Sequence, residues 1–125
     1  MKLKLSDGIN AARKSGELQP FIQAVPYFRW LNLRAERLGD ELITTMPYQD
    51  MLIGNPVLPA LHGGVTGALL ESAAMISLIG AMEEPILPRI INITVEYLRP
   101  GRAEDSFATG IVTKQGRRVA NVRAM

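Results

Sequence analysis

The sequence predicts an α+β fold in which an antiparallel β-sheet wraps around one long central helix. Residues 62–82 predict the helix, because apolar side chains cover most of its circumference and such a helix is buried on nearly every side. Residues 89–99, RIINITVEYLR, alternate apolar and polar side chains, which predicts a strand with one buried face. The chain has 125 residues, the size of one domain, and we expect residues 1–125 to form a single unit.

Two short helices are expected before the long one. Ser6 and Asp7 favour the start of a first helix that ends near Gly16. Apolar residues at helical spacing then predict a second amphipathic helix over residues 18–25, which Pro26 ends.

A hairpin and a loop are expected to lead into the long helix. Residues 27–37 favour an extended chain, residues 38–40 a turn, and residues 41–46 a returning strand. Residues 47–61 are rich in proline and glycine and indicate a loop.

At least three strands are expected after the long helix. The alternating segment is followed by a turn at residues 100–101 and a strand over residues 106–113. Residues 114–117 predict a hairpin turn, and the last strand begins near Arg118. Because no turn or cap follows that strand, we expect the natural chain to continue beyond Met125.

Composition excludes several classes of site and partner. Fourteen basic and twelve acidic residues leave a dispersed charge of +2, which argues against nucleic acid as the main partner. The absence of cysteine excludes disulfides and thiolate chemistry, and a single histidine argues against a transition-metal site. Residues 63–82 are long enough to cross a bilayer, but a carboxylate at their midpoint would cost several kcal/mol there. We therefore expect no membrane partner and, in the absence of an apolar signal segment, a cytoplasmic location.

The start of the long helix is the first candidate site. Gly63 and Gly64 let a ligand approach the backbone closely, and the first N–H groups of a helix are free and lie at its positive end. Such donors can stabilise an oxyanion formed from an ester or thioester carbonyl. The alternative is a glycine-rich helix start with His62 as a partly buried cap, which is the more common situation.

Glu71 is the second candidate, because it is the only charged residue between Asp50 and Glu83. Burial among apolar neighbours would raise its pKa, and such a carboxylate can act as a general base or attack a carbonyl itself. A purely structural carboxylate is the alternative. Nine residues separate it from His62, about two and a half helical turns and about 13 Å of rise, so the two side chains point to opposite sides. One site that contains both therefore requires two chains related by a two-fold axis.

Three segments together resemble a known family. NPVLPALHGGVTGALLESAAM, INITVEYLRPGR and GIVTKQGRRVANVRAM are similar, in this order, to the hotdog-fold acyl-CoA thioesterases of the phenylacetate-catabolism (PaaI-like) type. The resemblance runs from Asn55 to Met125. It implies a sheet curled around the helix, a homodimer with a continuous sheet or a homotetramer made of two such dimers, and two active sites at the subunit interface.

The resemblance also implies roles for individual residues. Glu71 corresponds to the catalytic carboxylate, where many relatives have Asp, and Gly63 to the residue that gives the oxyanion-hole N–H. His62 and Asn55 match residues that support the substrate or the attacking water. Gly64, with Arg117 and Arg118, matches positions that contact the substrate or the phosphates of coenzyme A.

The expected activity is hydrolysis of an acyl-CoA, or a related acyl thioester, to a free acid and a thiol. The expected machinery uses no metal and no cofactor other than the coenzyme A of the substrate. Two alternatives stay open at this point: a non-catalytic acyl-CoA-binding or regulatory module, and an acyl-thioester dehydratase. The sequence leaves open the acyl group, the identity of the thiol, and whether Glu71 acts as nucleophile or general base.

Overall fold

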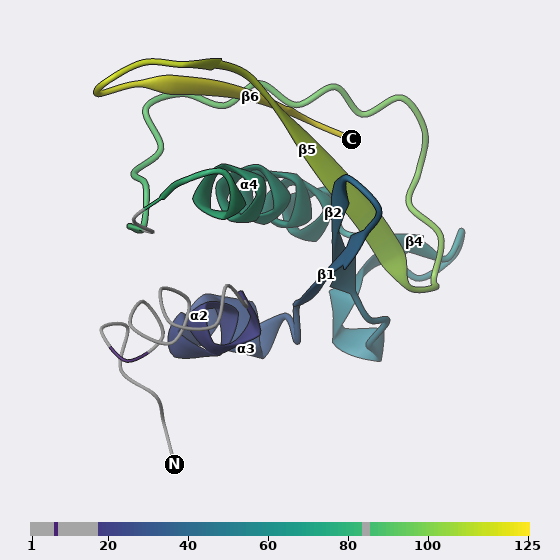
Figure 1. Cartoon of the computed structure of the whole chain (residues 1–125). Coiled ribbons are helices and arrows are strands. Elements are labelled where there is room, and N and C mark those ends of the chain that lie inside the picture. The colour runs from purple at the N-terminus through teal and green to yellow at the C-terminus, as the bar shows by residue number, and fades with distance from the viewer. Residues whose placement is uncertain (1–6, 8–17, 84–85) are drawn as a thin grey trace.

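The computed structural model describes residues 7, 18–83 and 86–125, so the first helix expected from Ser6 to Gly16 lies outside the described residues. Four strands form an antiparallel sheet in the order β1-β2-β5-β6, and the long helix α4 contacts β2, β5 and β6. Figure 1 shows these strands curving from one side of α4 to the space above it. The expected α+β fold, a sheet wrapped around a central helix, is confirmed.

The chain before the sheet forms two short helices, α2 (Gln19–Ala24) and α3 (Pro26–Trp30). The amphipathic pattern correctly predicted α2, which buries Phe21 and Ile22. The extended chain expected from residue 27 is wrong, because α3 covers its first residues. Pro26 ends one helix and begins the next, since a helix's first N–H has no partner inside the helix and proline loses nothing there.

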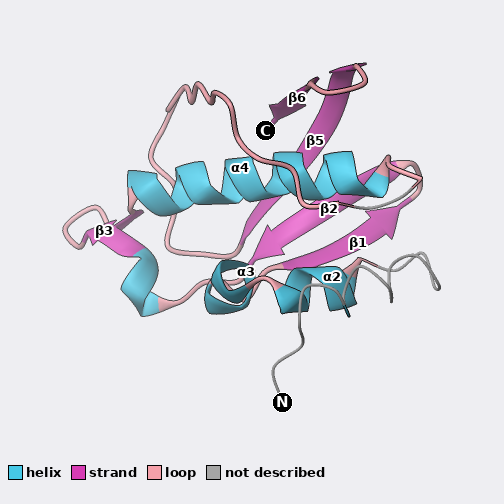
Figure 2. Cartoon of the chain, turned by 90° about the vertical axis from the view of Figure 1, so that its left-hand side faces the viewer, coloured by secondary structure: helices cyan, strands magenta, loops and turns pink. Residues whose placement is uncertain are grey.

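The predicted hairpin is present as β1 (Arg34–Leu38) and β2 (Glu41–Met46), with Leu38 opposite Glu41. Gly39 in the turn has φ +64°, a conformation that residues with a side chain rarely adopt. β2 also pairs with β5 (Ser106–Gln115), which pairs with β6 (Ala120–Ala124) through a second hairpin. The two strands and the turn expected after residue 105 are therefore confirmed (Figure 2).

The loop expected over residues 47–61 contains more structure than predicted. A 3-10 turn, η1 (Asp50–Leu52), leads into a small hairpin of β3 (Ile53–Asn55) and β4 (Ala60–Leu61). These two strands form their own sheet, beside the start of α4 (Figure 2).

Helix α4 (Gly63–Gly80) agrees with the prediction in its bounds and partly in its burial. Its side toward the sheet is buried and includes Leu69, Ala73 and Ile76. The other side, which carries Glu71, is only half-buried, because the sheet of one chain covers one side of the helix. Length and composition alone would allow α4 to cross a bilayer, but here it packs against three strands and supplies the core.

The strand predicted over residues 89–99 is not formed, and this prediction is wrong for the single chain. The segment is irregular, and three of its four alternating apolar residues are exposed, with Ile91 at 77% and Tyr97 at 58%, while Val95 is half-buried. Alternation specifies which side chains share a face, but a strand also needs a backbone partner, and the described residues provide none. Two strands of the main sheet therefore follow α4 in the described part of the chain, rather than at least three.

Candidate active site

His62 caps the start of α4. Its backbone is extended, with φ −61° and ψ 134°, and its Nδ1 accepts a hydrogen bond from the Gly64 N–H at 2.8 Å. A ring nitrogen that accepts a hydrogen bond carries no proton, so the neutral imidazole holds its proton on Nε2. The cap that the sequence offered as an alternative role for His62 is thus present, although the residue is exposed rather than partly buried.

The hydrogen bonds at this helix start leave one donor free. The His62 N–H donates to the Leu52 carbonyl at 2.8 Å, and the Val65 N–H donates to the His62 carbonyl at 3.0 Å. Gly64 is occupied by the imidazole. The Gly63 N–H has no acceptor among the described residues and lies at the exposed, positive end of α4. Of the two glycines that the sequence proposed, Gly63 is therefore the one with a donor available to a ligand.

The β3–β4 hairpin fixes the backbone that leads into His62. Ile53 pairs with Leu61, and the Leu61 N–H donates to the Gly101 carbonyl at 2.9 Å. The register shifts between Ile53 and Asn55, so Gly54 lies at a bulge. With the bond from His62 to Leu52, the cap residue is fixed by backbone contacts before the helix begins.

The segment that leads into this hairpin is anchored by Tyr48. Its N–H donates to the Asp105 carboxylate at 2.8 Å, and its hydroxyl donates to the Asp50 carboxylate at 2.8 Å. The hydrogen bond to Asp50, with smaller contributions from burial and from the negative charge, raises the pKa of Tyr48. Both contacts fix the start of η1, whose last residue receives the His62 N–H.

Asn55 closes the loop between β3 and β4. Its Oδ1 accepts hydrogen bonds from the Val57 N–H at 3.0 Å and the Leu58 N–H at 3.2 Å. The side-chain NH2 has no acceptor among the described residues. The structure thus brings Asn55 to the hairpin beside His62 and leaves its amide donors free.

Glu71 lies in the middle of α4, half-buried, on the side of the helix away from the sheet. The described residues give its carboxylate no hydrogen bond and no ion pair. Because α4 is one continuous helix, nine residues place Glu71 about half a turn away from His62 around the axis. Gly63 is eight residues from Glu71, about 12 Å along the helix axis, so one chain does not bring the carboxylate and the free Gly63 donor together.

Tyr97 was not identified from the sequence as a site residue. Its hydroxyl donates to the Gly63 carbonyl at 2.9 Å, and a Cβ added to Gly63 would lie 3.6 Å from the Tyr97 ring. The only signal in the sequence was the alternation that placed Tyr97 on the apolar face of the expected strand.

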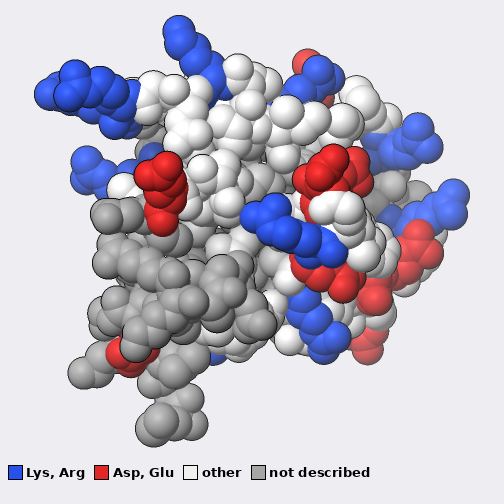
Figure 3. Space-filling view, viewed as in Figure 1, with Lys and Arg blue, Asp and Glu red and all other residues white. Residues whose placement is uncertain are grey.

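Arg117 and Arg118 lie in the exposed turn between β5 and β6. That turn lies toward the C-terminal end of α4, whereas His62 is at the N-terminal end (Figures 1 and 2). Basic side chains gather at the tip of this hairpin (Figure 3). The structure of one chain therefore does not bring these arginines to the helix start.

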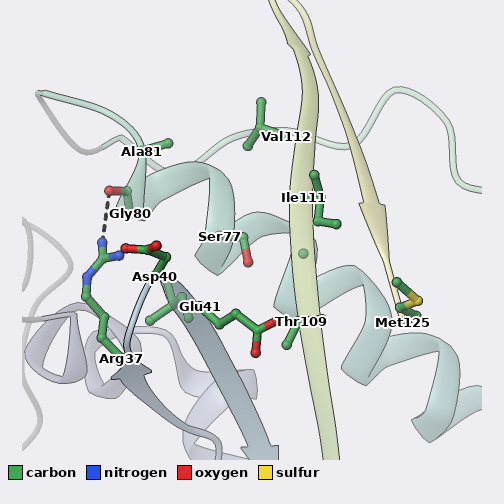
Figure 4. Close-up of a pocket in the computed structure, with 12 residues that line it drawn as sticks. Arg37, Asp40, Glu41, Ser77, Gly80, Ala81, Thr109, Ile111, Val112 and Met125 are labelled. Carbon is green, nitrogen blue, oxygen red and sulfur yellow. Dashed lines mark hydrogen bonds between the residues drawn. The ribbon is translucent and has the colours of Figure 1, made fainter.

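A cavity of about 500 Å³ opens at the C-terminal end of α4 (Figure 4). Arg37, Asp40 and Glu41 line it together with Ser77, and the Arg37 Nη2 donates to the Gly80 carbonyl at 3.2 Å. None of the residues proposed from the sequence lines this cavity. Within residues 7, 18–83 and 86–125, no group of three or more His, Asp or Glu side chains could hold a metal ion.

Comparison with known proteins identifies the family. The family model of the thioesterase superfamily matches residues 58–125, more than half of the chain. The medium/long-chain acyl-CoA thioesterase YigI of Escherichia coli K12 is 32% identical, in an alignment that covers 90% of this chain and 81% of that protein.

Two solved structures share the fold of this chain. A protein from Chromobacterium violaceum is 33% identical, with a TM-score of 0.70 over 93% of this chain and 80% of that one. A phenylacetic acid degradation-related protein from Ralstonia eutropha JMP134 is 20% identical and matches in fold, with a TM-score of 0.72 over 94% of this chain and 86% of that one. The antiparallel sheet around α4 is the hotdog fold that the resemblance implied. The chain belongs to the thioesterase superfamily.

Proposed function

We propose that the protein hydrolyses acyl-CoA thioesters at a site made by two chains. The observation that carries the proposal is the free Gly63 N–H at the positive end of α4, with every neighbouring donor of the helix start already occupied. As a member of its family the protein is a thioester hydrolase. The name of the Escherichia coli relative makes medium- and long-chain acyl-CoAs the first substrates to test.

The proposed reaction uses one backbone donor and one carboxylate. The thioester carbonyl accepts the Gly63 N–H, which stabilises the negative charge that develops on its oxygen. The Glu71 carboxylate of the second chain takes a proton from water while the water oxygen bonds to the carbonyl carbon. The carbon–sulfur bond then breaks, and the thiolate takes up the proton, giving a free acid and coenzyme A. Direct attack by Glu71 on the carbonyl, followed by hydrolysis of the anhydride, gives the same products.

Other residues complete the proposed site. The Nε2–H of His62 and the free amide donors of Asn55 belong to the same end of α4 as the Gly63 donor, and we expect them to contact the substrate or the water. Gly64 leaves room for the His62 ring, since a Cβ there would lie 2.8 Å from the Nδ1, and it stays a proposed substrate contact. Arg117 and Arg118 would bind coenzyme A phosphates, and their position at the far end of α4 is consistent with a contribution to the partner's site.

The proposal includes a homodimer, or a dimer of dimers, because eight residues of α4 separate Gly63 from Glu71 by about 12 Å along the helix axis. It includes no metal and no cofactor beyond the coenzyme A of the substrate. It keeps the expectations of a cytoplasmic location and of neither nucleic acid nor membrane as a partner.

The first experiment measures thiol release from a panel of acyl-CoAs by the wild type and by Glu71→Gln. The amide keeps the shape of the side chain but cannot take a proton from water or attack the carbonyl, so we expect kcat to fall by at least about a hundredfold. Thermal unfolding of both proteins controls for lost folding. Unchanged hydrolysis by the variant, or no turnover of any thioester by the wild type, would overturn the proposal.

A second experiment tests whether two chains share a site. Glu71→Gln and Gly63→Pro chains with different tags are co-expressed, and the mixed dimer is purified through both tags. One of its two sites then contains wild-type Gly63 and wild-type Glu71, so about half of the wild-type rate returns.

The control dimer pairs the wild type with a chain that carries both substitutions. In a shared site each active centre of this dimer has one altered residue, so activity is lost. In a site built from one chain, the control dimer keeps half of its activity and the first mixed dimer has none, which would refute the two-chain arrangement.

A further inference from the structure

Gly54 lies against the backbone of His62 with no room for a side chain. A Cβ added to Gly54 would lie 2.6 Å from the His62 Cα, 2.8 Å from its Cβ and 3.0 Å from its Cδ2. The φ angle of Gly54 is not in the left-handed region, so its backbone conformation does not require glycine. The close approach of strand β3 to His62 does require it.

His62 cannot move away from this contact without losing hydrogen bonds. Its N–H donates to Leu52 at 2.8 Å, and its carbonyl accepts the N–H groups of Val65 and Thr66 at 3.0 and 3.2 Å. Its ring accepts the Gly64 N–H. A side chain at position 54 would therefore shift either the β3 bulge or the capped start of α4.

We infer that Gly54 is a positioning residue for the active site. It holds the His62 imidazole on the Gly64 N–H and so leaves the Gly63 N–H as the free donor. With Nδ1 held as the acceptor, the proton of the neutral ring stays on Nε2 and points away from the helix start. The catalytic part of this inference rests on the proposed function. The effect on the imidazole does not.

The imidazole can be observed directly, because His62 is the only histidine in the chain. Nitrogen-15 NMR of the side chain separates a protonated ring nitrogen from an unprotonated one. In the wild type with a neutral ring, we expect one tautomer, protonated on Nε2, with Nδ1 as acceptor. In Gly54→Ala we expect a mixture of both tautomers, since the bond to Gly64 is disturbed.

The same variant is assayed for thiol release. A displacement of reacting groups by about 1 Å can cost about a hundredfold in rate, so we expect Gly54→Ala to lower kcat by about ten- to a hundredfold. KM should change less, because the variant leaves the rest of the proposed substrate site in place.

Gly110→Ala is the matched control. A Cβ on Gly110 would lie 2.7 Å from the Ser77 Oγ and 2.8 Å from the Ser77 Cβ, a contact as close as that of Gly54 but in the C-terminal half of α4. We expect this variant to unfold at a lower temperature than the wild type, yet to keep the wild-type tautomer and kcat.

The outcomes separate this inference from the proposed function. A wild-type ring protonated on Nδ1, a Gly54→Ala protein with the wild-type tautomer and kcat, or the same losses in Gly110→Ala would overturn the inference. A wild type that turns over no thioester would remove the proposed function, while the tautomer would still test the position of His62.

A further variant decides the matter if Gly54→Ala does not accumulate as folded protein. His62→Gly removes the Cβ and Cδ2 of residue 62, which make two of the three close contacts, and keeps its Cα. Glycine is tolerated at a helix N-cap. Folding of the double variant should recover in part. No recovery would show that the His62 side chain is not what excludes a Cβ at position 54, which would overturn the link between Gly54 and the imidazole.

Discussion

Gly63→Pro removes a single backbone N–H from the helix start and should change little else. Gly63 is the first residue of α4, a position that favours proline because the fixed φ suits the helix. The preceding residue, His62, has φ −61° and ψ 134°, a conformation that residues before proline adopt. A Cβ at position 63 meets only the Tyr97 ring at 3.6 Å, which is ordinary van der Waals contact.

The expected loss follows from the number of donors. The Gly63 N–H is the only one at this helix start that lacks an acceptor in the described part of the chain. Removal of one oxyanion donor costs about 10²- to 10³-fold in kcat, or about 3–4 kcal/mol of transition-state stabilisation. Stability should not fall, because proline at a compatible position stabilises by about 0.4–1 kcal/mol through the unfolded state.

Gly63→Ala is the control, since it adds the same Cβ and keeps the N–H. Initial rates of thiol release and thermal unfolding are measured for both variants with one acyl-CoA. We expect the alanine variant to stay within about tenfold of the wild type, well above the proline variant. A folded Gly63→Pro protein with wild-type kcat would refute the assignment of this donor, and equal losses in both variants would attribute the effect to bulk at position 63.

Two further predictions concern Asn55 and the two arginines. Asn55→Asp keeps the oxygen that accepts hydrogen bonds from Val57 and Leu58 but loses the free amide donors, whereas Asn55→Ala loses both. Because the proposed site uses these donors to contact substrate, we expect kcat/KM to fall in both variants. Amide hydrogen exchange of the loop should increase only in Asn55→Ala. Arg117→Ala combined with Arg118→Ala should raise KM for acyl-CoA by about tenfold, the scale of one lost charged hydrogen bond, without changing kcat. The KM for a short thioester without phosphates should stay the same, and an equal rise for both substrates would contradict a role in phosphate binding.

Elements with local signals were predictable from the sequence. The run of apolar residues after the glycine pair predicted the C-terminal end of α4 to within two residues. This was possible because a helix forms its backbone hydrogen bonds within its own segment. The hairpin of β1 and β2 was predictable because Gly39 supplies the turn. Pro26 was interpreted only as a helix stop, although the same residue also starts α3.

The failures concern contacts between distant parts of the chain. Residues 89–99 have the alternation of a strand, but pairing depends on a neighbouring backbone, which the pattern does not specify. The sequence suggested Gly63 and Gly64 as oxyanion donors together. Only the orientation of the His62 ring shows that Gly64 is occupied and Gly63 is free. Glycine is likewise required at position 54 because β3 lies against His62, and no pattern in the sequence predicts this contact.

The spacing of the proposed site also constrains how two chains would meet. A two-fold axis that lets each α4 place its Glu71 at the other's Gly63 must relate two antiparallel helices and exchange these positions. The axis then passes close to the residue midway between them, which is Gly67. Gly67 lies on the same side of α4 as Glu71, where the helix is not covered by the sheet. The Tyr97 hydroxyl lies 3.0 Å from the position of a Cβ on Gly67, and once it moves aside the absence of a side chain permits a short distance between helix axes. The residue that the symmetry places at the closest approach is thus one that allows it, and this favours a shared site over one assembled within a single chain.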